Sequence, residues 1–182
     1  MQIGGRHNIE NALAAASVCL MCGVHLREIS SLLSTYKGVS RRFDVQFSNE
    51  KITYIDDYAH HPEELKACIN AARELHPGKL ITGIFQPHLF SRTRDFLEGF
   101  AESLSMLDQL ILLDIYPARE PPIEGITSAV LLEKVSIKQK KLLAKHEIIA
   151  ALQAQKPEVL LTMGAGDIDQ LVEPIKQMLL TC

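Results

Sequence analysis

From about residue 43 onward, short apolar segments of the chain alternate with amphipathic, helix-forming segments. Four of the apolar segments are followed at once by a polar motif. The motifs are DDYAHHP at 56–62, QPHLFSRT at 86–93, DIYPARE at 114–120 and GAGD at 164–167. Alternating strands and helices favour a mostly parallel sheet with helices on both faces. Because ligands bind beyond the carboxyl ends of the strands in such sheets, the four motifs predict one site.

This alternation predicts an α/β fold class, a Rossmann-like three-layer domain built on a mostly parallel sheet. Apolar residues at every second position over 43–47 and 52–55, with a polar turn between them, predict a β-hairpin. The hairpin would leave one antiparallel strand at an edge of the sheet. The other strands are expected at 80–85, 109–114, 141–144 and 158–163, and the helices at 62–75, 91–106, 127–136, 146–154 and 167–180.

Residues 1–40 have a different character. They contain two helical segments, at 8–22 and 26–36, and no strand of their own, and Asn8 is the expected N-cap of the first helix. Because two helices cannot bury both of their faces alone, we expect residues 1–40 to be the end of a preceding domain and residues 41–182 to form the next domain. The loop at 37–42 is then the expected hinge.

The bulk composition argues against several classes of protein. A net charge of −3 gives no basic footprint for a nucleic acid. No apolar run approaches the ~20 residues of a membrane span, and residues 1–6 lack the apolar region of a signal peptide. Cys19 and Cys22 form a C-x-x-C motif without the second ligand pair of a zinc site. We therefore expect buried, reduced thiols and a cytoplasmic location.

The motif at 56–62 carries the strongest functional signal. Pro62 suits the first position of a helix, but capping does not account for two aspartates beside two histidines. A carboxylate such as Asp57 can accept both hydroxyl groups of a ribose, and His60 and His61 can orient a substrate or move a proton near neutral pH. A ligand-binding or catalytic loop is therefore favoured over two alternatives, a dinuclear metal site on the same carboxylates and imidazoles, and a capped surface loop.

His88 and Arg92 fall within one loop, where Ser91 is a candidate N-cap. A cation in a first helical turn opposes the helix dipole, which favours an anion-binding role for Arg92 over an ion pair with Asp95. The glycine-rich turn at 164–167 can cradle a phosphate, although a tight turn into the next helix is favoured. No G-x-x-x-x-G-K-[ST] loop occurs, so ATP chemistry would need residues outside this chain.

Two features near the start of the chain stay open on the residues alone. The side chains of Asn8 and Asn11 can pair with a purine edge, although helix capping is the simpler interpretation. Arg42, next to Arg41, lies between the two parts of the chain, and its guanidinium fork matches a phosphate. A solvated surface pair of arginines is the simpler interpretation.

Six motifs occur along the chain in a fixed order: HNxxNALAA, GVxRRF, DDYAHHP, PHxFSRT, DIYPA and GAGD. Together they resemble the C-terminal part of the Mur ligase family of peptidoglycan synthesis, and the resemblance covers almost the whole chain. The family has a UDP-sugar-binding domain, a central ATPase domain and a Rossmann-like C-terminal domain. The resemblance implies that residues 1–40 are the last helices of the central domain and that the remaining domains of the same chain are its partners.

The resemblance also implies roles for individual residues. Those implied in ATP binding, at the adenine, the phosphates and the ribose, are Asn8, Asn11, Arg42 and Asp57. Those implied around an incoming L-alanine are His60, His61, His88 and Arg92, the last three of them catalytic and Arg92 the partner of the alanine carboxylate. His61 is our hypothesis for the nearby proton acceptor.

The resemblance is strongest to the branch that joins L-alanine to UDP-N-acetylmuramate. There ATP converts the muramoyl carboxylate to an acyl phosphate, which the alanine amine attacks, and Mg²⁺ would be held outside this chain. The chain departs from the family pattern at Leu89, where an arginine is usual, and at Arg119, where a glycine is usual. The alternatives are a murein tripeptide recycling ligase of the same family and a nucleotide-binding module without activity.

Overall fold

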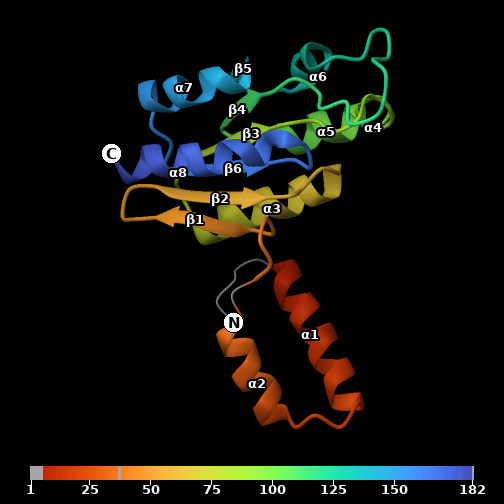
Figure 1. The fold of residues 1–182 in the computed structure, drawn as a ribbon, viewed down its shortest axis with the longest axis vertical. Coiled ribbons are helices and arrows are strands. Elements are labelled where there is room, and N and C mark those ends of the chain that lie inside the picture. Colours follow the sequence, from red (N-terminus) through yellow and green to blue (C-terminus); the bar gives the residue numbers. More distant parts are fainter. Residues whose placement is uncertain (1–5, 37, 182) are drawn as a thin grey trace.

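The computed structural model describes residues 6–36 and 38–181. Its centre is a six-stranded sheet with the strand order β1-β2-β6-β3-β4-β5 (Figure 1). β1 pairs with β2 in antiparallel fashion, and the other neighbouring strands are parallel. The predicted fold class and the antiparallel edge strand are confirmed. The strands are β1 (Asp44–Ser48), β2 (Thr53–Asp57), β3 (Ile81–Phe85), β4 (Gln109–Leu112), β5 (Gln139–Leu142) and β6 (Val159–Met163).

Helices cover both faces of this sheet, so that the domain has three layers (Figure 1). Those on one face are α3 (Pro62–Leu75), α5 (Leu97–Leu104) and α6 (Ser128–Lys134). Those on the other face are the 3-10 turn η1 (Lys145–Glu147), α7 (Ile148–Ala154), the 3-10 turn η2 (Asp167–Leu171) and α8 (Val172–Leu180). Two further helices, α1 (Arg6–Met21) and α2 (Leu26–Thr35), precede the sheet, and the short α4 (Phe90–Asp95) follows β3.

Each face of the sheet has its own hydrophobic core. Ile55 and Phe85 point to the first face and pack with Leu65 of α3 and Phe100 of α5. The neighbouring strand residues point the other way and form a second core with α7, η2 and α8, as Tyr54 and Ile84 do. Because every central strand is buried on both sides, the strands read in the sequence as nearly continuous apolar runs.

Several local expectations about helix bounds and strand pattern were wrong. α1 begins at Arg6, so Asn8 lies inside the helix and is not its N-cap. The helix expected at 91–106 is two helices, because Phe96 leaves helical geometry at φ −115° and ψ 23°. A bulge in β1 between Val45 and Phe47 breaks the expected alternation and leaves the Val45 side chain 54% exposed. The expectations for residues 1–5 and Lys37 lie outside the described residues.

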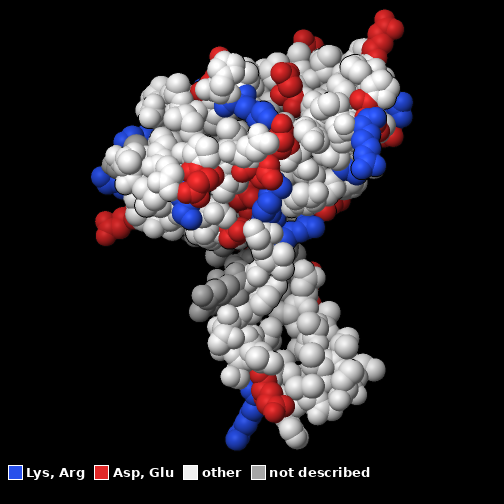
Figure 2. Space-filling view, viewed as in Figure 1, with Lys and Arg blue, Asp and Glu red and all other residues white. Residues whose placement is uncertain are grey.

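α1 and α2 project from the sheet as a separate pair (Figure 1). They carry large exposed apolar side chains, among them Ile9, Leu13, Val18, Met21 and Leu26. In Figure 2 this pair is mostly free of charged side chains, whereas Lys, Arg, Asp and Glu are interspersed over the sheet domain. Among the described residues, no helix has both the length and the apolar character needed to cross a membrane.

The first core predicts a sharp contrast between two substitutions. Phe100 has no exposed surface and its ring lies 5.6 Å from that of Phe85. Phe100→Ala should therefore lower the free energy of unfolding by about 3–5 kcal/mol. Leu180→Ala, at a side chain that is 57% exposed, should change it by less than about 0.5 kcal/mol. Urea unfolding followed by circular dichroism measures both, and equal effects would contradict this core assignment.

Candidate functional site

The register of the sheet brings the polar motifs together. Asp57 at the end of β2 and Phe85 at the end of β3 both lie beside Met163 at the end of β6. The next residues continue this contact, since the Gly164 amide donates to the Asp57 carbonyl and the Gln86 amide to the Met163 carbonyl. The loop after β4 joins them through an isolated bridge between His88 and Tyr116. The prediction that the four motifs meet at one edge of the sheet is confirmed.

Asp56 links β2 to β6 and to Arg41 at the carboxyl ends of the strands. Its side chain is fully buried and accepts hydrogen bonds from Thr162 Oγ1 at 2.7 Å and from Arg41 Nε at 3.1 Å. Burial raises the pKa of this carboxyl, and the hydrogen bond from Thr162 and the charge of Arg41 oppose that shift. Asp56 therefore serves the fold through a partly buried ion pair.

Asp57 connects the linker, which runs from Val39 to Phe43, to the histidine loop at 58–61. One of its oxygens accepts the Phe43 amide and the other accepts the Ala59 amide, both at 2.7 Å. Burial raises the pKa of this carboxyl as well, against the effect of the two amides. Within the described part of the chain, no group of three or more His, Cys, Asp or Glu side chains is arranged to hold a metal ion.

The two adjacent arginines have different surroundings. Arg41 adopts a left-handed conformation at φ 60° and donates through Nη2 to the Gly164 carbonyl at 2.8 Å, so its guanidinium is tied to the sheet. The Arg42 side chain is 52% exposed and lies 3.9 Å from Glu64. Both guanidinium groups lie over the ring of Tyr58, at 5.0 and 5.6 Å. Arg42 is thus the one whose charge can meet a ligand.

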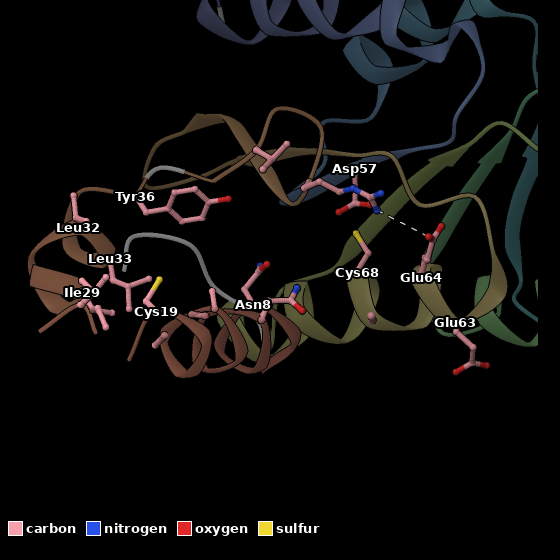
Figure 3. A pocket seen from close by; sticks show the side chains of 18 residues that line it. Asn8, Cys19, Ile29, Leu32, Leu33, Tyr36, Asp57, Glu63, Glu64 and Cys68 are labelled. Carbon is pink, nitrogen blue, oxygen red and sulfur yellow. Dashed lines mark ion pairs between the residues drawn. The ribbon is translucent and has the colours of Figure 1, made fainter. Parts of the chain in front are cut away.

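A cleft of about 1000 Å³ separates the helix pair from the start of α3 (Figure 3). Its polar lining includes the four residues expected to bind a nucleotide: Asn8, Asn11, Arg42 and Asp57. The rest of the wall is largely apolar and comes from both helices of the pair, for example Ala12, Ala15, Ile29 and Leu33. Cys19 and Cys68 also line it, and among the described cysteines Cys22 is exposed, contrary to the expectation of buried thiols.

The histidines gather at the neighbouring strand ends. The rings of His60 and His88 lie edge to face with centroids 6.3 Å apart, and His88 stacks on Tyr116 at 5.7 Å. His61 is the N-cap of α3: its Nδ1 accepts the Glu63 amide at 3.5 Å, and its ring packs on Phe96 at 4.6 Å. Pro62 occupies the first helical turn, as predicted.

His88 has an unusual environment. Its Nδ1 is buried and has no hydrogen-bond partner among the described residues. Burial lowers the pKa of this imidazole, the charges of Arg92 and His60 lower it further, and Glu120 opposes them. The lowered pKa favours the neutral imidazole, whose buried Nδ1 is left without a hydrogen-bond partner in the described part of the chain.

Arg92 lies in α4, close to His88. Among the residues that the structure describes, no carboxylate lies within ion-pair distance of it, and Asp95 pairs with Arg94 instead, at 2.8 Å. Ser91 is not the N-cap of α4, because its hydroxyl and its amide both donate to Glu120. The position before α4 belongs to Leu89, which has a left-handed φ of 71°.

The glycine-rich turn at 164–167 is a tight turn. Gly164 has φ 145°, and a Cβ added there would lie 2.8 Å from the Gln86 carbonyl oxygen. The turn is fixed by side chains of two of the motifs and by Lys145, which lies outside them: Gln86 donates to Asp167 at 2.8 Å and accepts the Ile168 amide, and Lys145 pairs with Asp167. The hydrogen bonds of this turn are thus made within the protein.

A family model described as "Mur ligase, glutamate ligase domain" matches residues 41–166. The chain belongs to the Mur ligase family. It is 48% identical over 175 residues to the UDP-N-acetylmuramate–L-alanine ligase of Flavobacterium johnsoniae. The aligned region covers 96% of this chain and 39% of the relative. The enzyme of the same name from Parabacteroides distasonis is 50% identical over 172 residues, covering 94% of this chain and 37% of the relative.

Solved structures agree with this assignment. The UDP-N-acetylmuramate-alanine ligase MurC of Thermotoga maritima superposes with a TM-score of 0.83 at 26% identity, covering 100% of this chain and 39% of that one. A murein peptide ligase from Psychrobacter arcticus shares the fold, with a TM-score of 0.66 at 20% identity, covering 98% of this chain and 38% of that one. This chain therefore spans about two-fifths of the length of the curated relatives that it matches.

The two arginines of this Mur ligase chain should differ in their effect on stability. Arg41→Ala leaves the carboxylate of Asp56 buried without its cation, which should cost about 2 kcal/mol or more of unfolding free energy. Arg42→Ala removes an exposed ion pair and should cost less than about 1 kcal/mol. Urea unfolding of both variants is the measurement, and a larger loss for Arg42→Ala would contradict these assignments.

The lowered pKa of His88 predicts a pH dependence of stability. Between that lowered pKa and the ordinary value of 6.5, the unfolded chain binds more protons than the folded one, so the free energy of unfolding falls as the pH drops through this window. His88→Gln should reduce the fall. Part of it should remain, because burial also lowers the pKa of His76. Urea unfolding at pH 7.5 and 5.5 tests this, and an equal fall in variant and wild type would count against it.

Proposed function

We propose that this chain is the C-terminal part of an ATP-dependent ligase that joins L-alanine to UDP-N-acetylmuramate in peptidoglycan synthesis. One observation carries the proposal: the four residues expected to meet ATP line one cleft, and the loops beside it carry the residues expected to meet alanine. Relatives that bear this activity in their names are 47–51% identical to the chain.

We also propose that residues 1–40 belong to the central ATPase domain of the longer protein and that residues 41–182 form its C-terminal domain. The exposed apolar side chains of α1 and α2, such as Leu13 and Met21, support this division, because they leave a surface to be covered by the missing part. The loop at 37–42 is the proposed hinge between the domains. The UDP-sugar would be bound by the part of the protein that this chain lacks.

At the nucleotide end, the chemistry of the lining fits ATP. The amides of Asn8 and Asn11 offer both donors and acceptors to the edge of adenine. The exposed guanidinium of Arg42 suits the phosphates, and each oxygen of Asp57 has a lone pair left for a ribose hydroxyl after accepting one amide. No described cluster suits Mg²⁺, so we assign the metal to the rest of the protein.

At the amino-acid end, Arg92 has no ion-pair partner among the described residues and suits the carboxylate of L-alanine. His60, His61 and His88 would surround the amine.

In the reaction, the muramoyl carboxylate takes the terminal phosphoryl group of ATP to give an acyl phosphate. The amine attacks the acyl carbon, and phosphate leaves with the electrons of the broken C–O bond. This chain contributes by positioning the reactants and by neutralising charge. Because ATP and a UDP-sugar are its substrates, we place the enzyme in the cytoplasm.

Phosphate release by the full-length protein tests the proposal. It should require ATP, UDP-N-acetylmuramate and L-alanine together. Arg92→Ala should raise the KM for alanine about tenfold or more, because a charge-assisted contact to the carboxylate is lost. Arg94→Ala, which removes a cation already paired with Asp95, is the matched control and should leave that KM unchanged. Release with L-Ala-γ-D-Glu-meso-diaminopimelate instead of alanine would favour the recycling ligase, and release with neither would contradict a ligase.

A further inference from the structure

The carboxylate of Glu64 lies between the two ends of the proposed site. Its Oε2 accepts the His60 amide at 2.9 Å and lies 3.3 Å from His60 Nδ1. Its Oε1 lies 3.9 Å from Nη1 of Arg42, the ion pair drawn as a dashed line in Figure 3. One half-exposed side chain in the first turn of α3 thus contacts an arginine of the nucleotide cleft and a histidine of the amino-acid end.

The contacts of His60 fix the state of its ring. Nδ1 lies 2.9 Å from the Tyr58 carbonyl oxygen, which can only accept a hydrogen bond, so Nδ1 carries the proton. In the neutral ring, Nε2 then has a free lone pair. His61 differs, because its Nδ1 already accepts the Glu63 amide and its protonation there would remove the N-cap. Of these two neighbouring rings, His60 is the one prepared to accept a proton.

We infer that Glu64 is a positioning residue that holds His60 ready for the amino acid while leaving Arg42 free to turn to the phosphates of ATP. This rests on the proposed ligase function. The α-ammonium group of alanine gives one proton to Nε2 of His60, and the Nδ1–H stays hydrogen-bonded to the Tyr58 carbonyl with the Glu64 carboxylate beside it. The freed lone pair forms the C–N bond as phosphate leaves with the C–O electron pair, and phosphate takes the second proton of the nitrogen. A base oriented by a carboxylate behind it is a recurring arrangement in enzymes.

The simpler role for Glu64 is to cap α3 through the His60 amide. Glutamine serves such a cap as well as glutamate does. Glu64→Gln therefore separates the two roles, since it keeps a side-chain acceptor for the amide and loses the charge beside the imidazole. Glu63→Gln removes the same charge from the preceding residue, whose side chain is exposed and pairs with Lys66, so it is the matched control.

The test uses steady-state phosphate release by the full-length protein. Glu64→Gln should lower kcat/KM for alanine about tenfold or more, because a charge-assisted contact is lost. The KM for ATP should stay within about twofold, because the exposed pair with Arg42 contributes little. Glu63→Gln should match the wild type in both, and all three proteins should have equal melting temperatures. In a His60→Ala background, Glu64→Gln should cause no further loss.

Three results would overturn the inference. The first is an alanine dependence of Glu64→Gln equal to that of Glu63→Gln, and the second is an equal rise in KM for ATP and alanine. The third is an additive loss in the double variant. Each of these leaves the proposed function standing, provided that the wild type shows alanine-dependent release. A wild type without such release overturns the proposed function and this inference together.

Discussion

The structure depends on how the two adjacent carboxylates at the end of β2 are neutralised. Asp56 is buried against Arg41 and Thr162, and Asp57 against two backbone amides, one from the linker and one from the histidine loop. Buried carboxylates are tolerated when they are paired and fully hydrogen-bonded. Because their partners come from three separate segments, satisfying these two side chains fixes the linker, the histidine loop and the end of β6 relative to one another.

At two places in the site, one of two adjacent residues holds the fold and the other faces the ligand. Arg41 is tied to the fold, and Arg42 beside it keeps an exposed charge at the cleft. His61 caps α3, and His60 before it presents a free ring nitrogen. Arg41 thus holds the backbone next to Arg42, and His61 holds the backbone next to His60. Such rigid support is what a site needs if it is to position reactants.

The parts of the fold that follow from local pattern could be predicted from the sequence. Buried parallel strands are apolar throughout, so β2, β3 and β6 were recognised, and the position of Pro62 marked the start of α3. The break at Phe96 could not be predicted, because nothing in the local sequence forbids a continuous helix there. The start of α1 was misplaced because Asn8 suits an N-cap by type but lies within the helix.

For the site too, the local pattern could be predicted from the sequence and the long-range contacts could not. The sequence placed the motifs at strand ends, and parallel topology brought them together. It could not distinguish Arg41 from Arg42, because their difference arises from the left-handed backbone at Arg41 and from contacts with residues more than a hundred positions away. The contacts of Glu64 with Arg42 and His60 could not be predicted either, because they depend on the path of the linker.

The cleft and the histidine loops should be two ends of one site, and a structure of the full-length protein with a non-hydrolysable ATP analogue and L-alanine would show this. We expect adenine beside Asn8 and Asn11, phosphates at Arg42 and the alanine carboxylate at Arg92, with the amine facing His60 and His88. A nucleotide bound away from this cleft, or alanine bound away from these loops, would contradict it.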